Sequence, residues 1–259
     1  MKFKECSIAG KKFNVDTFDS INAENELDPD AILSASGNSP RGPPTSNSYH
    51  NLDLDEEARL FFISLAVCHT VIPEEASDGS LNYNASSPDE KALVEGAAMF
   101  GFKFSGRKPD SALVTIKDEA VEEFEVLDTI EFTSARKRMS TIVRFPDGKL
   151  KLLIKGADMM INDRLGNDKS THKKHLDVTF GHLDDFARKG LRTLCLATKD
   201  ISEEEYRVWK NEFIDASNAI DGRFQSYFTI KSSIEFDRSK AVYSIILSLI
   251  TFWLNEKLM

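Results

Sequence analysis

Cysteine is scarce in this chain, which carries three cysteines among its 259 residues and no CxxC pair. Cys6, Cys68 and Cys195 are odd in number and far apart, so the sequence argues against both a disulfide framework and a zinc site. We therefore predict three reduced, buried thiols. We also identify no secretory signal, because the charged start at 1–6 is not followed by an apolar run.

Long hydrophobic runs are equally rare. The longest run, at 241–254, is shorter than the roughly 20 residues that a membrane-spanning helix needs. We interpret it as a buried or interfacial helix and keep membrane association through 242–254 as the alternative. The chain on its own is accordingly expected in the cytoplasm.

Positive charge is outnumbered as well, since 33 Lys and Arg stand against 42 Asp and Glu and leave a formal net charge of −9. General nucleic-acid binding needs a broad cationic face, so we exclude nucleic acid as a partner. Nucleotide binding needs only a local basic patch and stays open.

Several familiar catalytic and binding motifs are absent. The sequence holds no GxxxxGK[ST] phosphate loop, no GxGxxG after a strand, no HRD or DFG and no HExxH. His172 and His175 lie close together, but their neighbours are lysines rather than carboxylates or thiolates. We predict a solvated loop there rather than a metal site.

What is present divides the chain into four regions. Residues 1–24 contain a short β element, and 25–52 are rich in Pro, Ser, Asn and Gly, which predicts a flexible loop. Residues 53–220 have the patterns of a folded core. The last region, 221–259, has weak patterns and reads as a divergent tail that ends in the short apolar segment.

Hydrophobic periodicity predicts helices at 56–69, 88–100, 157–165, 178–189 and 203–219, and strands at 113–116, 124–132, 140–145, 150–155 and 191–198. A polar loop is expected at 74–86. Ser87, Pro88 and Gly101 mark the best-specified helix, and residues 146–148 close a hairpin. Because strands come in adjacent runs, we predict an α+β fold with a mainly antiparallel, twisted sheet flanked by helices.

Four segments carry candidate chemistry, although each has a plain structural explanation when taken alone. In 132–140 an aromatic ring precedes three successive cations, which suits a ligand with a flat base and a phosphate tail. Lys155 ends a strand on its polar face, before a Gly-Ala turn that leaves the backbone open to a ligand. The other two segments are the acidic helix start at 87–90 and the helix stop and strand start at 190–194.

In this order and spacing the four segments resemble the nucleotide-binding domain of phospholipid-transporting P-type ATPases, the lipid flippases. The matching runs are SPDE at 87–90, FTSARKRMS at 132–140, KGAD at 155–158 and GLRTL at 190–194. The opening 1–13 also looks like the stretch that follows the family's phosphorylation site. The resemblance covers about 1–220 and implies that 1–24 begin the nucleotide-binding domain and 53–220 are its core.

The resemblance implies that the ligand is ATP and that its base is held by three of these residues. Phe132 would stack on adenine, because a π-face holds any base. Glu90 would lie near the base, where a carboxylate accepts from the exocyclic amine. Lys155 would line the pocket beneath the base and the ribose.

Four more residues are implied to contact the same nucleotide. Ser134 and Lys137 would reach it from the same strand end as Phe132. Arg192 and Thr193 would reach the phosphates, for which the fork of an arginine is well shaped.

The resemblance also implies parts that this sequence lacks. In the family an aspartate in a DKTGT motif is phosphorylated, and TGD and GDGxND motifs hold phosphate and Mg²⁺; none of these motifs occurs here. We therefore expect this chain alone to bind ATP without turnover, and to have no metal ligands of its own.

In the complete protein the implied partners are the phosphorylation and actuator domains and a membrane phospholipid, at the cytosolic face of a membrane. Two alternatives stay open at this point. The first alternative is a stand-alone nucleotide-binding or regulatory module. The second is a truncated gene product without activity.

Overall fold

The computed structural model describes residues 1–15, 56–75, 81–165, 172–218, 229–230, 232–235 and 243–244. The loop expected at 25–52 lies outside the described residues. So does most of the tail expected at 221–259, including its apolar segment apart from 243–244.

Seven of the described strands form one antiparallel sheet in the order β11-β10-β9-β8-β7-β6-β5. Their bounds are β5 (Phe102–Lys108), β6 (Ser111–Ile116), β7 (Ala120–Ile130), β8 (Arg138–Arg144), β9 (Leu150–Gly156), β10 (Cys195–Ile201) and β11 (Tyr243–Ser244). Neighbouring strands from β5 to β9 are consecutive in the chain, and two helices intervene before β10. The predicted α+β class with an antiparallel sheet is confirmed.

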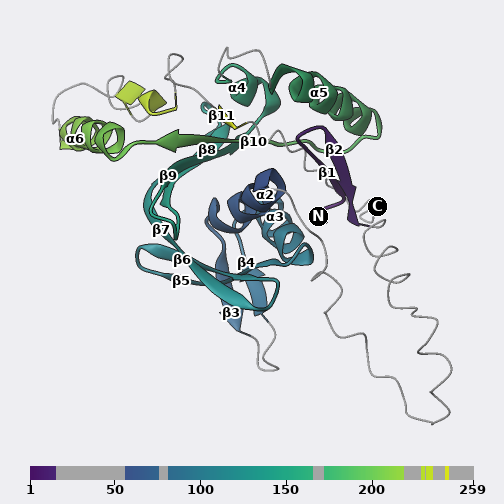
Figure 1. Ribbon diagram of the computed structural model, residues 1–259, viewed down its shortest axis with the longest axis horizontal. Helices are drawn as coiled ribbons and strands as arrows, with labels where there is room; N and C mark the ends of the chain where they lie inside the picture. Colours follow the sequence, from purple (N-terminus) through teal and green to yellow (C-terminus); the bar gives the residue numbers. More distant parts are fainter. Residues whose placement is uncertain are drawn as a thin grey trace, which may run out of the picture.

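Helices cover both faces of the sheet, which curves around α2 (Glu56–Val67) and α3 (Pro88–Met99) in Figure 1. Leu153 of β9 packs in the core that contains α2 and α3, whereas Leu152 and Ile154 pack in separate clusters. The clusters of Ile154 and Leu152 contain residues of α5 (His172–Arg188) and of α6 (Glu203–Asn218) respectively. Alternate residues of a strand point to opposite faces, so β9 is buried along nearly its whole length.

The first described segment forms a hairpin, β1 (Glu5–Ile8) and β2 (Lys11–Asn14), where the sequence predicts a short β element. It docks on α5 through polar contacts. Lys189 Nζ donates to Glu5 Oε1 at 2.7 Å, and Lys12 Nζ donates to Asp185 at 3.1 Å. The hairpin is thereby tied to the helix that precedes the segment 190–194.

The polar loop expected at 74–86 is in part wrong, because β3 (Ile72–Glu75) and β4 (Leu81–Asn84) pair there as a two-stranded ribbon. Pro73 does not end α2 but lies inside β3, and a proline is tolerated in such an edge strand. The hydroxyl of the buried Tyr83 donates to the carbonyl oxygen of Phe104 at 2.7 Å. This contact ties the ribbon to β5, a strand that we did not predict.

Several element boundaries also differ from the prediction. The helix at 88–100 is confirmed as α3, with Gly101 at φ +84° after it, but the Ser87 side chain makes no capping hydrogen bond. The helix expected at 157–165 is limited to α4 (Asp158–Asn162). β10 begins at Cys195 rather than 191, and β7 ends at Ile130, so Phe132 lies beyond the strand.

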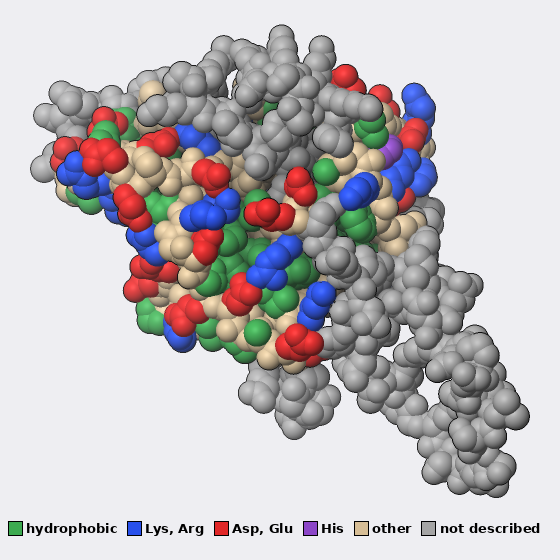
Figure 2. All heavy atoms as spheres, in the orientation of Figure 1, with side chains coloured by type: hydrophobic (Ala, Val, Ile, Leu, Met, Phe, Trp, Pro, Cys, Tyr) green, Lys and Arg blue, Asp and Glu red, His purple; other side chains and the backbone are tan. Residues whose placement is uncertain are grey.

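The surface of the described residues mixes the two signs of charge. Figure 2 shows acidic and basic side chains interspersed over the face that it presents, with hydrophobic side chains between them. The three cysteines are free and buried, as predicted. Within the described ranges, no helix combines the length and the apolar character needed to cross a bilayer.

Candidate functional site

The four candidate segments meet at one end of the sheet. There β7 ends, β8 begins, β9 ends and β10 begins, and the registers pair Met139 and Leu196 with Lys155 from either side. The first turn of α3 reaches the same place, because Glu90 contacts Lys155 directly. The segments thus lie together although they span more than a hundred residues of sequence.

The floor of this site consists of Thr70, Glu90 and Lys155. Lys155 Nζ donates to Glu90 Oε1 at 2.7 Å, and the Thr70 hydroxyl donates to Glu90 Oε2 at 2.7 Å. The side chains of Lys155 and Glu90 are only 7% and 14% exposed. Lys155 is therefore not the exposed lysine of a polar strand face, because β9 is covered on both faces and the ammonium is matched by a buried carboxylate.

The electrostatics of the floor favour ionised Glu90. Burial by itself raises the pKa of this carboxyl, but the Lys155 ammonium and the Thr70 donors outweigh burial and lower the pKa overall. The net charge of the pair is zero, which lowers the cost of holding both groups away from water.

The rim of the site consists of Arg192 and of the turn 131–137, which carries Phe132, Ser134 and Lys137. Phe132 is 60% exposed, an unusual state for a ring of this size. The turn is closed by its own backbone, since Lys137 N donates to Thr133 O at 2.7 Å. Lys137 O in turn accepts from Ala157 N at 3.0 Å, which joins the rim to the end of β9.

The three successive cations of this turn do not act together, which corrects the expectation of a concentrated basic patch. Lys137 is exposed, whereas the side chains of Arg136 and Arg138 are only 7% and 5% exposed. Arg136 Nη1 donates to the carbonyl oxygens of Ile130 and Glu131 at 3.1 and 2.7 Å. The two arginines therefore hold the turn from beneath and do not face a phosphate.

Glu235 supplies the opposite charge for these arginines, 99 residues along the chain from Arg136. Its side chain is 0% exposed and forms ion pairs with Arg136 and with Arg138, the latter at 2.6 Å. Ser140 also donates to it. We did not predict this role, because Glu235 lies in the segment expected to be a divergent tail and a lone glutamate carries no local sign of burial.

Arg192 connects the rim to the first turn of α3. Its guanidinium forms an ion pair with Asp89 at 3.0 Å, with the side chains 62% and 26% exposed. Thr193 is half-buried beside it. Phe132, Ser134 and Thr193 are brought to this end of the sheet by the backbone, without a side-chain hydrogen bond among the contacts of the described residues.

Gly156 is a further residue of the site that the sequence marks only as part of a turn. A Cβ at this position would lie 2.5 Å from Arg138 Cβ and 2.7 Å from Lys137 O. The close approach of β9 to the turn 131–137 therefore requires glycine.

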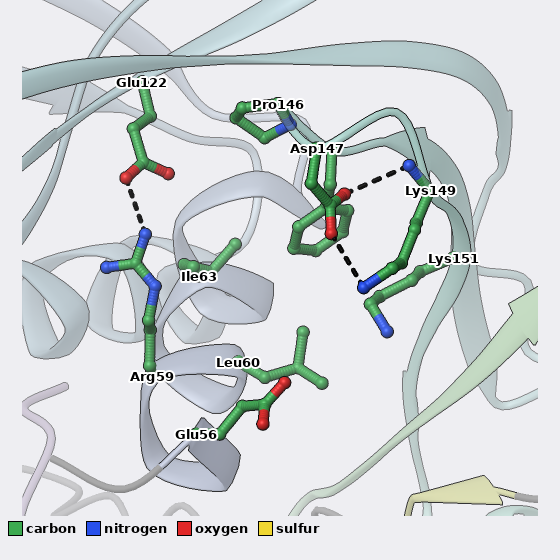
Figure 3. Close-up of a pocket in the computed structure, with 10 residues that line it drawn as sticks. Glu56, Arg59, Leu60, Ile63, Glu122, Pro146, Asp147, Lys149 and Lys151 are labelled. Atoms are coloured by element: carbon green, nitrogen blue, oxygen red, sulfur yellow. Dashed lines mark hydrogen bonds and ion pairs between the residues drawn. The ribbon is translucent and has the colours of Figure 1, made fainter.

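A hollow of about 370 Å³ lies beside the turn that joins β8 to β9, at the end of these strands away from Lys155. Arg59, Glu122, Asp147 and Lys149 line it (Figure 3). Four of its charged groups are paired with one another, since Arg59 pairs with Glu122 at 2.6 Å and Lys149 with Asp147 at 3.1 Å. The hollow is separated from the candidate residues by the length of β8 and β9, so we do not assign the ligand to it.

The described residues offer no group of three or more His, Cys, Asp and Glu side chains placed to hold a metal ion. The two carboxylates at the start of α3, Asp89 and Glu90, each face a cation of the protein. This donor set does not fit a protein-held Mg²⁺.

Comparison with known proteins places this arrangement in a family. The sequence profile of the P-type ATPase cytoplasmic domain N matches residues 57–230. This range contains the four candidate segments and ends before Glu235.

Individual relatives agree with the profile. The chain is 46% identical over 185 residues to phospholipid-transporting ATPase DRS2 of Saccharomyces cerevisiae. The matched region covers 70% of this chain and 13% of the yeast protein. It is 41% identical over 244 residues to phospholipid-transporting ATPase C887.12 of Schizosaccharomyces pombe, covering 92% and 18% of the two chains. It is 37% identical over 252 residues to human phospholipid-transporting ATPase ID, covering 91% and 20%. The chain thus spans 13 to 20% of the length of these relatives.

Proposed function

The chain belongs to the P-type ATPase family, in which it is the cytoplasmic domain N, and from this premise we propose that it is the ATP-binding domain of a phospholipid-transporting member. The observation that carries the proposal is the convergence of Glu90, Lys155, Arg192 and the Phe132 turn at one end of the sheet. A flat exposed ring, a buried ion pair and an exposed guanidinium meet there, as a base followed by phosphates requires.

We assign the adenine end of the ligand to Phe132 and the floor. The ring is exposed and offers a face on which a base stacks. Glu90 Oε2 already accepts twice from Thr70, but Oε1 accepts from Lys155 alone and keeps a second lone pair, with which the carboxylate is able to accept from the exocyclic amine. Lys155 then lies beneath the base and ribose.

We assign the phosphate end to the remaining cations. Arg192 is mostly exposed and its carboxylate partner Asp89 is only half-buried, so the guanidinium can exchange Asp89 for a phosphate at little cost. Lys137 is an exposed cation, and Ser134 and Thr193 provide hydroxyl donors beside it. Mg²⁺ would arrive with the nucleotide or on other parts of the complete protein.

In the complete protein we propose that ATP bound here phosphorylates an aspartate of the phosphorylation domain. The actuator domain and a membrane phospholipid are the further partners, and the site faces the cytosol. The printed names of the relatives, which describe phospholipid transport, support this proposal. The activity belongs to the complete protein, since phosphoryl transfer needs an in-line acceptor and charge stabilisation beyond these residues.

Titration of the whole chain with ATP in a calorimeter tests the binding site. Phe132→Ala should weaken ATP binding by about 1–3 kcal/mol, because the base loses its stacking surface. The free energy of unfolding should change by less than about 0.5 kcal/mol, because the ring is mostly exposed.

The matched control is Val121→Ala. Val121 is 62% exposed and lies at the opposite end of β7, so the substitution should leave ATP binding unchanged. Equal ATP affinity in the wild-type and Phe132→Ala chains would remove Phe132 from the site.

A further inference from the structure

The turn 68–71, which follows α2, is fixed by a buried histidine. His69 Nδ1 accepts from Val71 N at 3.1 Å, and His69 Nε2 therefore donates to Ala66 O at 2.8 Å. Both ring nitrogens are thus committed to the backbone of the turn. Burial, followed by the nearby cations, lowers the pKa of His69 to about 3, so the ring is neutral.

A second contact holds the same turn from the sheet. Arg107 of β5 donates through Nη2 to His69 O at 3.0 Å, and its guanidinium lies 5.6 Å from the Phe104 ring centroid. The His69 ring packs edge-on against Phe104 at 4.5 Å. Backbone and side chain of residue 69 are therefore held in one position relative to the strand.

Thr70, the next residue, connects this fixed turn to the site. Thr70 N and Thr70 Oγ1 donate to the same oxygen of Glu90, at 3.3 and 2.7 Å. The other oxygen accepts from Lys155. The carboxylate is therefore held between a fixed turn and the lysine at the end of β9, and the torsional freedom of the Glu90 side chain is removed.

We propose that Thr70 is a positioning residue of the nucleotide site, which fixes the Glu90 carboxylate and through it the Lys155 ammonium. This inference rests on the proposed function, because its consequence is felt as ATP affinity. It adds a residue that lies outside the four family motifs and whose side chain is not needed for packing, since Thr70 is exposed.

A double-mutant cycle with the whole chain tests the proposal. Thr70→Val keeps the shape and removes the hydroxyl, and it should weaken ATP binding about tenfold, as expected for one hydrogen bond to a charged group. Thr70→Ser restores the hydroxyl and should bind ATP within about twofold of wild type. In the Glu90→Ala background, which leaves Thr70 no acceptor at position 90, Thr70→Val should change ATP affinity by less than about twofold, because Thr70 acts through the Glu90 carboxylate.

Thr115→Val is the matched control, because it removes a threonine hydroxyl that makes no contact with Glu90. The Thr115 hydroxyl, on β6, is hydrogen-bonded to the Ser105 hydroxyl of β5 at 2.8 Å. This substitution should leave ATP affinity unchanged. An equal loss of affinity from Thr70→Val in the wild-type and Glu90→Ala backgrounds overturns the positioning role.

A measurement without nucleotide separates this inference from the proposed function. The Glu90 carboxyl titration, followed by carbon NMR, should shift to higher pH in Thr70→Val, because a donor to the ionised form is lost. An unchanged midpoint overturns the positioning role. A shifted midpoint in a chain that does not bind ATP supports the positioning role and overturns the proposed function instead.

Discussion

The floor and the rim of the site hold their polar side chains in opposite ways. In the floor, Lys155 is buried and Glu90 is largely buried, and the two neutralise each other at the place where the ligand is proposed to bind. In the rim, Phe132 and Arg192 are exposed, and the buried charges lie beneath the turn, where Arg136 and Arg138 meet Glu235. The floor is therefore held together by the residues that are proposed to face the ligand, and the rim is held by buried residues beneath it.

Because of this difference, folding stability and ligand binding are expected to depend on different residues of the same site. Side chains of the rim that face solvent contribute little to folding, so their substitution tests binding alone. The residues that support the rim are buried and charged, so their loss costs folding energy first. Three predictions test this division. They concern the buried support of the rim, the contact between the rim and the floor, and the turn beside the floor.

The largest effect is expected from Glu235→Gln. The substitution leaves Arg136 and Arg138 buried without their counter-charge, which should lower the free energy of unfolding by about 3–5 kcal/mol. Denaturant unfolding measures the loss. Glu203→Gln breaks a surface pair with Arg144 and is the control, for which we expect little change because the partners are exposed. Equal stability of the two variants would mean that Glu235 does not support the rim.

An intermediate effect is expected from Gly156→Ala, which sharpens the link between the two regions. The new Cβ would meet Arg138 Cβ and Lys137 O, so the turn must shift, at a cost of about 1–3 kcal/mol of unfolding free energy. Hydrogen exchange at the Ala157 amide, which donates to Lys137 O, should become faster. In the control Gly106→Ala, the nearest atom to the new Cβ is 3.6 Å away, and exchange at Ala157 should stay as in the wild type.

The smallest effect comes from His69, in the turn that precedes Thr70 of the floor, and appears only as the pH falls. The folded chain protonates His69 at a pKa of about 3, against 6.5 for a free histidine, so the unfolded state takes up this proton first as the pH falls. Stability is therefore full above pH 6.5 and decreases from there toward pH 3. Between pH 7 and 5.5 the loss from His69 should be about 1 kcal/mol.

His69→Gln checks this assignment, because glutamine keeps one acceptor and one donor but does not titrate. Urea unfolding at the two pH values should show a smaller decrease in the variant than in the wild type. Identical decreases would assign the acid sensitivity to other groups.

Local signals predicted those elements whose cause is itself local. Pro88 and the acidic first turn start α3, Gly101 ends it in a left-handed conformation, and Gly148 at φ +83° closes the β8–β9 hairpin. The strands β3 and β5 were not predicted, because one contains Pro73 and the other Gly106, and both residues normally argue against a strand. Pairing with β4 and β6 stabilises these two segments, and a local pattern does not contain that information.

The sequence by itself determined the fold class, the family and the segments that carry the candidate chemistry, because each is written in residues that are adjacent in the chain. Only the tertiary structure decided which of those side chains are buried and which are exposed at the candidate site. Glu90 meets Lys155 across 65 residues and Arg136 meets Glu235 across 99. A charged side chain is buried only where folding delivers an opposite charge, so the sequence could not show that Lys155 lies in the floor and that Arg136 and Arg138 lie beneath the rim.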